Sequence, residues 1–152
     1  MKRIITAFIS ILLLLVGCGC TEEKQIEKNE TILKYYETSE EYFDYESTFF
    51  DFRLPNYWKG KFTVDVFADH EDFYEKDSYN ENGTGLVFSI YSYGDKSYRK
   101  NHKNYKYLCY SEELEKHYVL VYPDEETYIE SAQTTYNDMK EAISIVLYTF
   151  KV

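Results

Sequence analysis

The chain has 152 residues and a formal net charge of −10, with 44% hydrophobic and 19% aromatic residues. This length allows one ordinary domain with a short appendage and excludes a multidomain enzyme. The hydrophobic content is sufficient for a core, while 2 Pro and 6 Gly residues argue against a collagen-like or wholly disordered chain. Because the acidic balance repels phosphate backbones, we expect no nucleic-acid partner.

The N-terminal residues have the layout of a bacterial export signal. Lys2 and Arg3 precede an apolar run, Ile4 to Val16, that is shorter than the roughly 20 apolar residues needed to span a bilayer. The run ends in Leu15-Val16-Gly17-Cys18, which resembles the lipobox of bacterial lipoproteins. This resemblance implies that residues 1–17 are cleaved and that a lipid on Cys18 anchors the protein to the extracytoplasmic side of the cell membrane. An ordinary signal peptide and an uncleaved signal anchor are the alternatives.

Two further cysteines, Cys20 and Cys109, remain once Cys18 is acylated. A disulfide in an oxidising compartment needs two partners, so these are the pair available. Cys109 lies inside an alternating strand pattern. We therefore expect a buried free thiol there, with a Cys20 to Cys109 bridge as the alternative.

Residues 18–46 are expected to form the lipidated cysteine and an acidic tether. Within this range Thr21–Glu46 carries nine acidic side chains against three lysines and contains no Pro or Gly. Such a composition is typical of a solvated segment. A weak helical face runs through its middle, formed by Ile26, Ile32, Leu33 and Tyr36, so part of it is able to dock on the domain.

Residues 47–152 are expected to form a single domain that opens with strands. Alternating apolar residues mark a first strand that ends at Pro55, and a second from Phe62 to Ala68 with a shorter stretch around Asp72 beside it. The segment 80–85 has turn chemistry. Leu86–Tyr93 follows, and both of its faces are fairly apolar, which predicts a central strand covered on two sides.

The C-terminal half supplies a hairpin and a helix. The segments 105–110 and 116–122 form the expected hairpin, joined by an acidic turn. Apolar residues then recur at helical spacing from Ala132 to Phe150. The fold class predicted from these elements is α+β: an antiparallel sheet of about five strands with a C-terminal amphipathic helix packed on it.

One motif connects this chain to known families. The segment from Leu54 to Lys61 reads Leu-Pro-x-x-Trp-x-Gly-Lys, and Gly83 and Gly85 lead into the central strand. The pattern resembles small lipoproteins and extracytoplasmic domains of low-GC Gram-positive bacteria, and more distantly the DcrB and PsbP-like sandwich families. The distant resemblance implies an antiparallel sheet between helices, and neither implies catalytic residues. Physically, Pro55 fixes the exit from the strand and Trp58 is expected to cover one end of the core.

Enzymatic and metal-dependent chemistry have little support in the sequence. His70, His102 and His117 are not spaced as metal ligands, and no nucleophile elbow or phosphate-binding glycine loop occurs. We therefore expect no metal site, no cofactor and no catalysis. The alternative is a small envelope hydrolase that uses a pair of carboxylates from one acidic region. Its candidates are Asp65, Asp69, Glu71, Asp72, Glu75 and Asp77.

A basic cluster stands out from the acidic background between the central strand and the hairpin. It is interleaved with Tyr98, His102 and Tyr105 and consists of Lys96, Arg99, Lys100, Lys103 and Lys106. Such a cluster could bind an anionic wall polymer, lipid headgroups, an acidic partner protein or the acidic tether itself. A solvated loop is the simpler interpretation. The leading prediction is a non-catalytic binding or interaction module of the cell envelope. A structural spacer, with this loop disordered, is a further alternative.

Overall fold

The structure, a computed structural model, describes residues 27–152, so the export signal, Cys18 and Cys20 lie outside the described residues. The helices are α1 (Glu30–Thr38), α2 (Lys76–Asn82), α3 (Tyr98–Asn101), α4 (Gln133–Glu141) and α5 (Ile143–Thr149), with short 3-10 turns η1 (Asn56–Trp58) and η2 (Glu130–Ala132). The strands are β1 (Tyr42–Glu46), β2 (Asp51–Pro55), β3 (Phe62–Val66), β4 (His70–Glu75), β5 (Leu86–Tyr93), β6 (Tyr105–Ser111) and β7 (Lys116–Val121).

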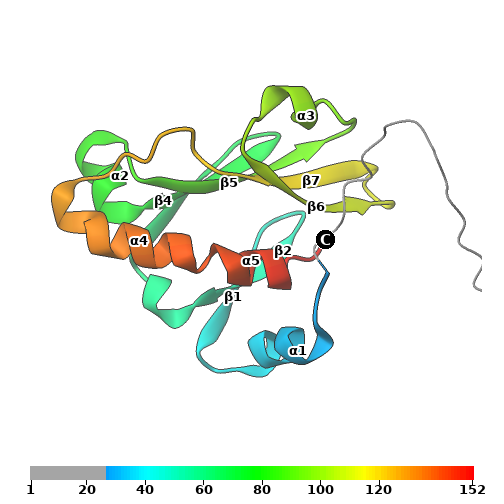
Figure 1. Cartoon of the computed structure of the whole chain (residues 1–152), viewed down its shortest axis with the longest axis horizontal. Coiled ribbons are helices and arrows are strands. Elements are labelled where there is room, and N and C mark those ends of the chain that lie inside the picture. The colour runs from blue at the N-terminus through cyan, green and yellow to red at the C-terminus, as the bar shows by residue number, and fades with distance from the viewer. Residues whose placement is uncertain (1–26) are drawn as a thin grey trace, which may run out of the picture.

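A five-stranded antiparallel sheet of order β3-β4-β5-β7-β6 forms the centre of the fold, and β1 and β2 form a separate two-stranded sheet. The predicted α+β class is confirmed, and β5 is the central strand as expected. Helices α4 and α5 lie on one face of the five-stranded sheet and α3 lies on the other (Figure 1). We call these the inner and the outer face.

The hydrophobic core fills the space between the inner face, the β1–β2 sheet and the C-terminal helices. Phe73 and Phe88 stack with ring centroids 4.5 Å apart, and Phe52 of β2 packs on both rings. Tyr136 and Met139 of α4 close the core and are fully buried. Trp58 is also fully buried, so the expectation that the indole covers part of the core is confirmed.

The C-terminal apolar stripe forms two helices rather than one. Ala142 separates α4 from α5, with φ −75° and ψ −6°, and its amide donates to the carbonyl of Met139 at 3.1 Å. This hydrogen bond spans three residues, as in a 3-10 helix, instead of the four of an α-helix. It tightens the turn and bends the chain at Ala142. The stripe itself is confirmed, because Ile143 and Val146 are buried against the sheet.

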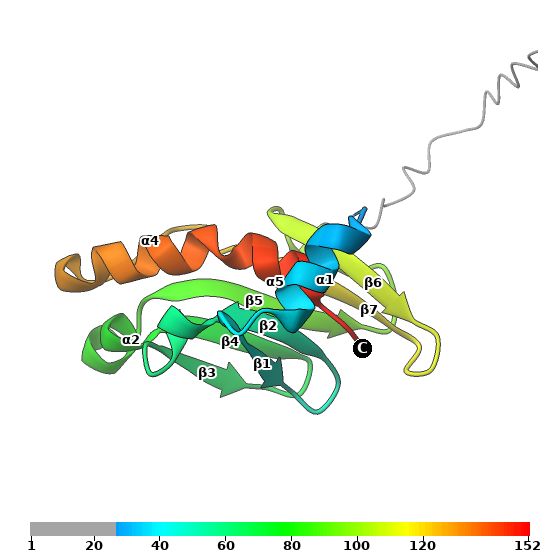
Figure 2. The same cartoon turned by 90° about the horizontal axis from the view of Figure 1, so that it is seen from below.

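The folded part of the chain begins before residue 47, the predicted start of the domain. The side chain of Asn29 accepts bonds from the amides of Thr31 and Ile32 and so begins α1. Strand β1 pairs with β2, and α1 packs beside α5 (Figure 2). The acidic composition of this segment concealed apolar and aromatic side chains that reach the core: Tyr36, Tyr42, Phe43 and Tyr45.

Two segments expected to be turns or loops contain helices. The chain between β4 and β5 forms α2, which ends at Gly83 in the left-handed conformation with φ 72°. Gly85 has φ 90°, and a Cβ there would lie 2.7 Å from Cβ of Ser78, so no larger residue fits. The segment 94–104 contains α3.

None of the helices within residues 27–152 is long and apolar enough to cross a membrane.

Candidate binding surface on α3

The segment that carries the basic cluster is built on a buried tyrosine. Tyr98 of α3 is fully buried on the outer face. Its ring centroid lies 5.8 Å from that of Tyr93, 5.5 Å from that of Tyr105 and 6.0 Å from that of Tyr107. The segment is therefore a fixed part of the fold, in contrast to the disordered loop that the spacer alternative predicts.

Polar contacts hold both ends of the segment. At its start the amide of Ser97 donates to Oδ1 of Asp95 at 2.9 Å, and the hydrogen bonds from Ser97 lower the pKa of Asp95. After α3, the hydroxyl of Tyr93 and Nε2 of His102 share a hydrogen bond of 2.7 Å. Burial lowers the pKa of His102, so the imidazole is neutral at neutral pH and adds no charge to the surface.

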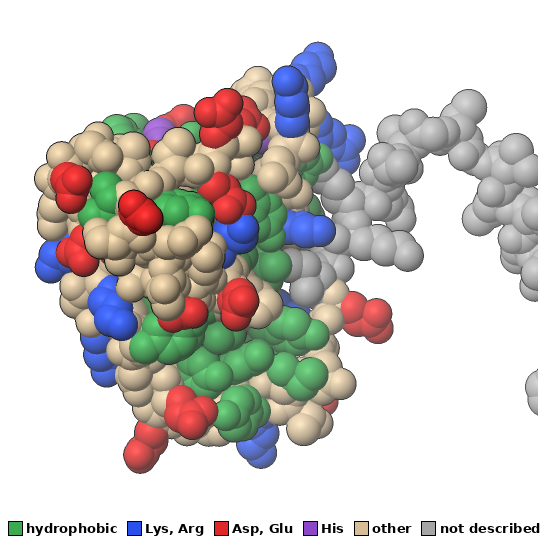
Figure 3. All heavy atoms as spheres, turned by 60° about the vertical axis from the view of Figure 1, so that its left-hand side comes forward, with side chains coloured by type: hydrophobic (Ala, Val, Ile, Leu, Met, Phe, Trp, Pro, Cys, Tyr) green, Lys and Arg blue, Asp and Glu red, His purple; other side chains and the backbone are tan. Residues whose placement is uncertain are grey.

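Four basic side chains of the predicted set project from α3 and its flanks: Lys96, Arg99, Lys100 and Lys103, all exposed. We call these four residues the α3 platform. Figure 3 shows Lys and Arg side chains projecting at the top of the molecule, where α3 lies in Figure 1. Within residues 27–152 the side chains of Lys96, Lys100 and Lys103 form no ion pair or hydrogen bond. Their charges are therefore available to a partner.

Lys106, the fifth predicted residue, is separated from the platform. It lies on β6 between Tyr105 and Tyr107, whose rings both contact Tyr98 on the outer face. Successive residues of a strand point to opposite faces, so Lys106 points away from α3. Lys106 therefore lies apart from the α3 platform, and its part in partner binding stays a prediction.

The structure brings all three histidines to the outer face, which the sequence did not reveal. His70 stacks between Phe67 and Tyr91, with ring centroids 4.4 and 4.3 Å away. Its Nδ1 lies 2.8 Å from Oδ1 of Asp69, and this hydrogen bond lowers the pKa of Asp69. The hydroxyl of Tyr107 contacts Nδ1 of His117 at 3.1 Å. Each histidine thus has a structural partner.

The carboxylates proposed for a hydrolase are divided between the two faces of the sheet. Asp65 and Asp72 are direct cross-strand partners on the outer face, where Asp65 accepts a hydrogen bond from Tyr79 at 2.9 Å. Glu71 and Glu75 are buried on the inner face. Glu75 caps α2 by accepting bonds from the amides of Asp77 and Ser78, which is a structural role.

Glu71 is held by the β1–β2 hairpin and lines a small cavity. It accepts hydrogen bonds from the hydroxyls of Ser47 and of Tyr45, the latter at 2.7 Å. Burial is the main reason why the pKa of Tyr45 is raised. The cavity, about 60 Å³ in volume, is also lined by Asp69 and His70. It has room for water molecules but not for a sugar ring, so the hydrolase alternative gains no support from it.

Of the larger hollows on the described part of the chain, two have volumes of about 400 Å³ or more. One, of about 440 Å³, lies between the β1–β2 and β6–β7 turns and includes Phe49 and Leu114 in its lining. The other, of about 400 Å³, lies beside Pro55 and Tyr57. Neither is lined by a histidine or a basic side chain, so neither extends the α3 platform.

Cys109 is a free, half-buried thiol among residues 27–152, and burial raises its pKa. The proposed partner Cys20 lies outside the described residues, so the alternative of a Cys20 to Cys109 bridge stays a prediction. In the same described range, no group of three or more His, Cys, Asp and Glu side chains is arranged to hold a metal ion.

Comparisons of the chain with protein families, with curated proteins and with solved structures find no match. The resemblance to Gram-positive lipoproteins therefore stays an expectation based on the Leu54–Lys61 motif.

Proposed function

We propose that this protein is a membrane-anchored, extracytoplasmic lipoprotein that acts as a non-catalytic binding module and uses the α3 platform to bind an anionic polymer of the cell envelope. The main observation in favour of the proposal is that the segment bearing the platform is held in a fixed position by a buried side chain. Its cations project from a segment whose central side chain, Tyr98, is fully buried. A ligand that contacts Lys96, Lys100 and Lys103 therefore does not have to order a flexible loop first, which reduces the entropic cost of binding.

The charge distribution supports an anionic ligand rather than a general attraction. The whole chain has a net charge of −10, so a polyanion is repelled from most of the surface. The exposed cations of the platform provide a local exception. A polyanion that docks elsewhere on the protein meets like charges, so the charge distribution directs it to the platform.

The ligand class tested first is a phosphodiester polymer, with poly(glycerol phosphate) as the probe. The variant Lys96→Gln, Lys100→Gln, Lys103→Gln should bind it about 3- to 150-fold more weakly in calorimetric titrations, because each exposed lysine contributes about 0.2–1 kcal/mol. Arg99 is left intact because it has a further interaction within the protein.

The matched control removes three exposed lysines that lie away from α3: Lys34→Gln, Lys61→Gln, Lys76→Gln. It changes the net charge by the same amount and should bind with nearly the wild-type affinity. Equal weakening of both variants would show that total charge, rather than the platform, determines binding.

Membrane attachment is tested separately through Cys18. The substitution Cys18→Ser should leave an unprocessed precursor or release the protein into the medium, because serine has no thiol to accept the lipid. Fractionation of cells and mass measurement of the product check this. Unchanged membrane attachment of a processed Cys18→Ser chain would contradict the proposed anchor.

A further inference from the structure

The outer face of the sheet has two halves of opposite charge. The α3 platform covers the half formed by β5, β7 and β6. Asp65, Asp69 and Asp72 belong to the other half, at strands β3 and β4 and the turn between them. Asp95, which interacts electrostatically with Lys100, and Asp124, which interacts with His102, are acidic exceptions in the basic half.

Contacts across the strands show that both sets lie on one face. His70 and Tyr91 are register partners and stack, so they share a face. Asp72 lies two residues after His70 and therefore on that face too, directly opposite Asp65. On the other side of Tyr91, the ring of His102 lies 4.5 Å away and leads into the platform.

The two halves also differ in height. Helix α3 stands above the outer face over β5 and β7 (Figure 1). On the β3–β4 half, exposed and half-buried side chains cover the strands directly, among them Tyr74, Tyr79 and Phe67. The face therefore consists of a basic ridge beside a lower acidic surface that also offers aromatic rings.

We propose that a second copy of this chain docks on the outer face in a two-fold dimer, with the α3 platform of each copy over the Asp65, Asp69 and Asp72 half of the other. A two-fold axis in the interface and parallel to β5 exchanges the halves. Each ridge then meets the lower surface of its partner, and Tyr91 lies near the axis. An interface of this kind uses one self-complementary patch twice, as closed dimers do.

The dimer goes beyond the proposed function and does not require the envelope polymer. The two are linked, because a polyanion on the platform competes with the acidic half of the second copy. Adding poly(glycerol phosphate) is therefore expected to dissociate the dimer. Failure of one proposal leaves the other open, since the dimer is measured without polymer, and polymer binding is repeated on the Asp65→Lys, Asp69→Lys chain, which keeps the platform and should not dimerise.

The test uses two charge-reversed forms of the full chain in mild detergent, analysed by light scattering at low salt. One carries Asp65→Lys and Asp69→Lys, so both of its halves are basic. The other carries Lys100→Glu and Lys103→Glu, so its platform is reversed. Wild type is expected to have twice the mass of one chain. Each variant alone should have the mass of one chain. An equal mixture of the two variants should form mixed dimers, with twice the mass of one chain.

The mixture also shows whether the monomeric variants are folded, because only two folded chains can form the mixed dimer. The control Glu40→Lys, Glu141→Lys changes the charge equally at exposed sites away from the outer face and should dimerise like wild type. A monomeric wild type at low salt, a variant that dimerises alone, or a mixture that stays monomeric would each overturn the proposal. Raising the salt to about 0.5 M should dissociate the wild-type dimer, because screening shortens the reach of exposed charges.

Discussion

Replacing Trp58 by Ala should lower the free energy of unfolding by about 3–5 kcal/mol. The indole is fully buried and packs on Phe62 and Phe88, with ring centroids 5.7 and 6.2 Å away. Its removal leaves a cavity at the point where η1 meets the sheet. Urea unfolding followed by far-ultraviolet circular dichroism measures the loss, because the substitution removes the tryptophan fluorescence.

The variant Trp58→Phe separates volume from hydrogen bonding. Nε1 of Trp58 has no hydrogen-bond partner among the described residues, so a phenyl ring loses packing area but no bond. We expect Trp58→Phe to lose roughly half as much stability as Trp58→Ala. A loss below about 1 kcal/mol for Trp58→Ala would contradict the core position of this residue.

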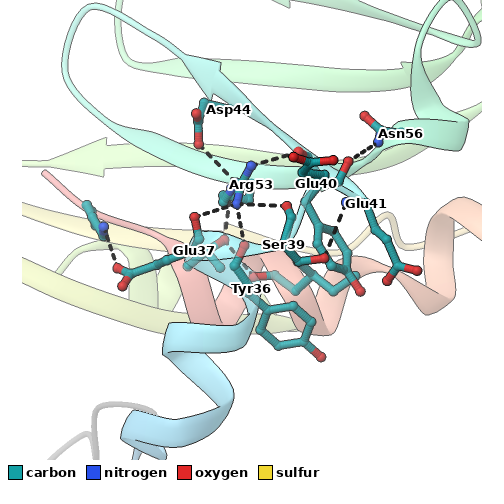
Figure 4. A network of polar contacts seen from close by, with 12 residues as sticks. Tyr36, Glu37, Ser39, Glu40, Glu41, Asp44, Arg53 and Asn56 are labelled. Atoms are coloured by element: carbon teal, nitrogen blue, oxygen red, sulfur yellow. Dashed lines mark hydrogen bonds and ion pairs between the residues drawn. The ribbon is translucent and has the colours of Figure 1, made fainter.

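Replacing Arg53 by Ala should cost about 2–4 kcal/mol, because several charge-assisted hydrogen bonds are lost together. The guanidinium donates to the carbonyls of Tyr36, Glu37 and Ser39 at the end of α1, and to that of Tyr42 at 2.7 Å (Figure 4). The carbonyls of Tyr36, Glu37 and Ser39 have no partner within the helix, so Arg53 satisfies the end of α1 and joins it to β2.

The Arg53→Ala substitution should destabilise α1 more than the rest of the fold. Amide hydrogen exchange in α1 is expected to accelerate more than exchange in β5, because only α1 is released. Arg53→Lys is the control: it keeps the charge, and hence the pairing with Asp44, whose Oδ1 lies 3.0 Å from Nε of Arg53. A lysine lacks the planar fork, so it should recover part of the protection. Equal acceleration in α1 and β5 would count against a local role for Arg53.

The sequence was informative where the pattern is periodic. The alternation around Phe88 and the helical stripe through Tyr136 and Val146 identify the central strand and the packed C-terminal helices. The prediction of a solvated tether was wrong for residues 30–46. It was based on the many acidic side chains, but Tyr42 and Tyr45 of this segment pack against the core. Alternation along β6 was sufficient to exclude Lys106 from the basic surface once Tyr105 was placed on it.

The rest of the site depends on register, which the sequence does not contain. The stack of Phe67, His70 and Tyr91 exists because β4 pairs with β5 through His70 and Tyr91. The fixed position of α3 likewise depends on Tyr98 reaching rings from β5 and β6. Both are contacts between strands that lie far apart in the chain, and no local pattern specifies them.

The most direct test of the central claim is the salt dependence of poly(glycerol phosphate) binding by wild type and by the Lys96, Lys100 and Lys103 variant. Each cation that neutralises a phosphate releases a counterion, so the logarithm of the binding constant falls linearly with the logarithm of salt concentration. If the α3 platform binds the polymer, the slope should be shallower by about two to three for the variant. Equal slopes and affinities for the two proteins would contradict the assignment of this surface.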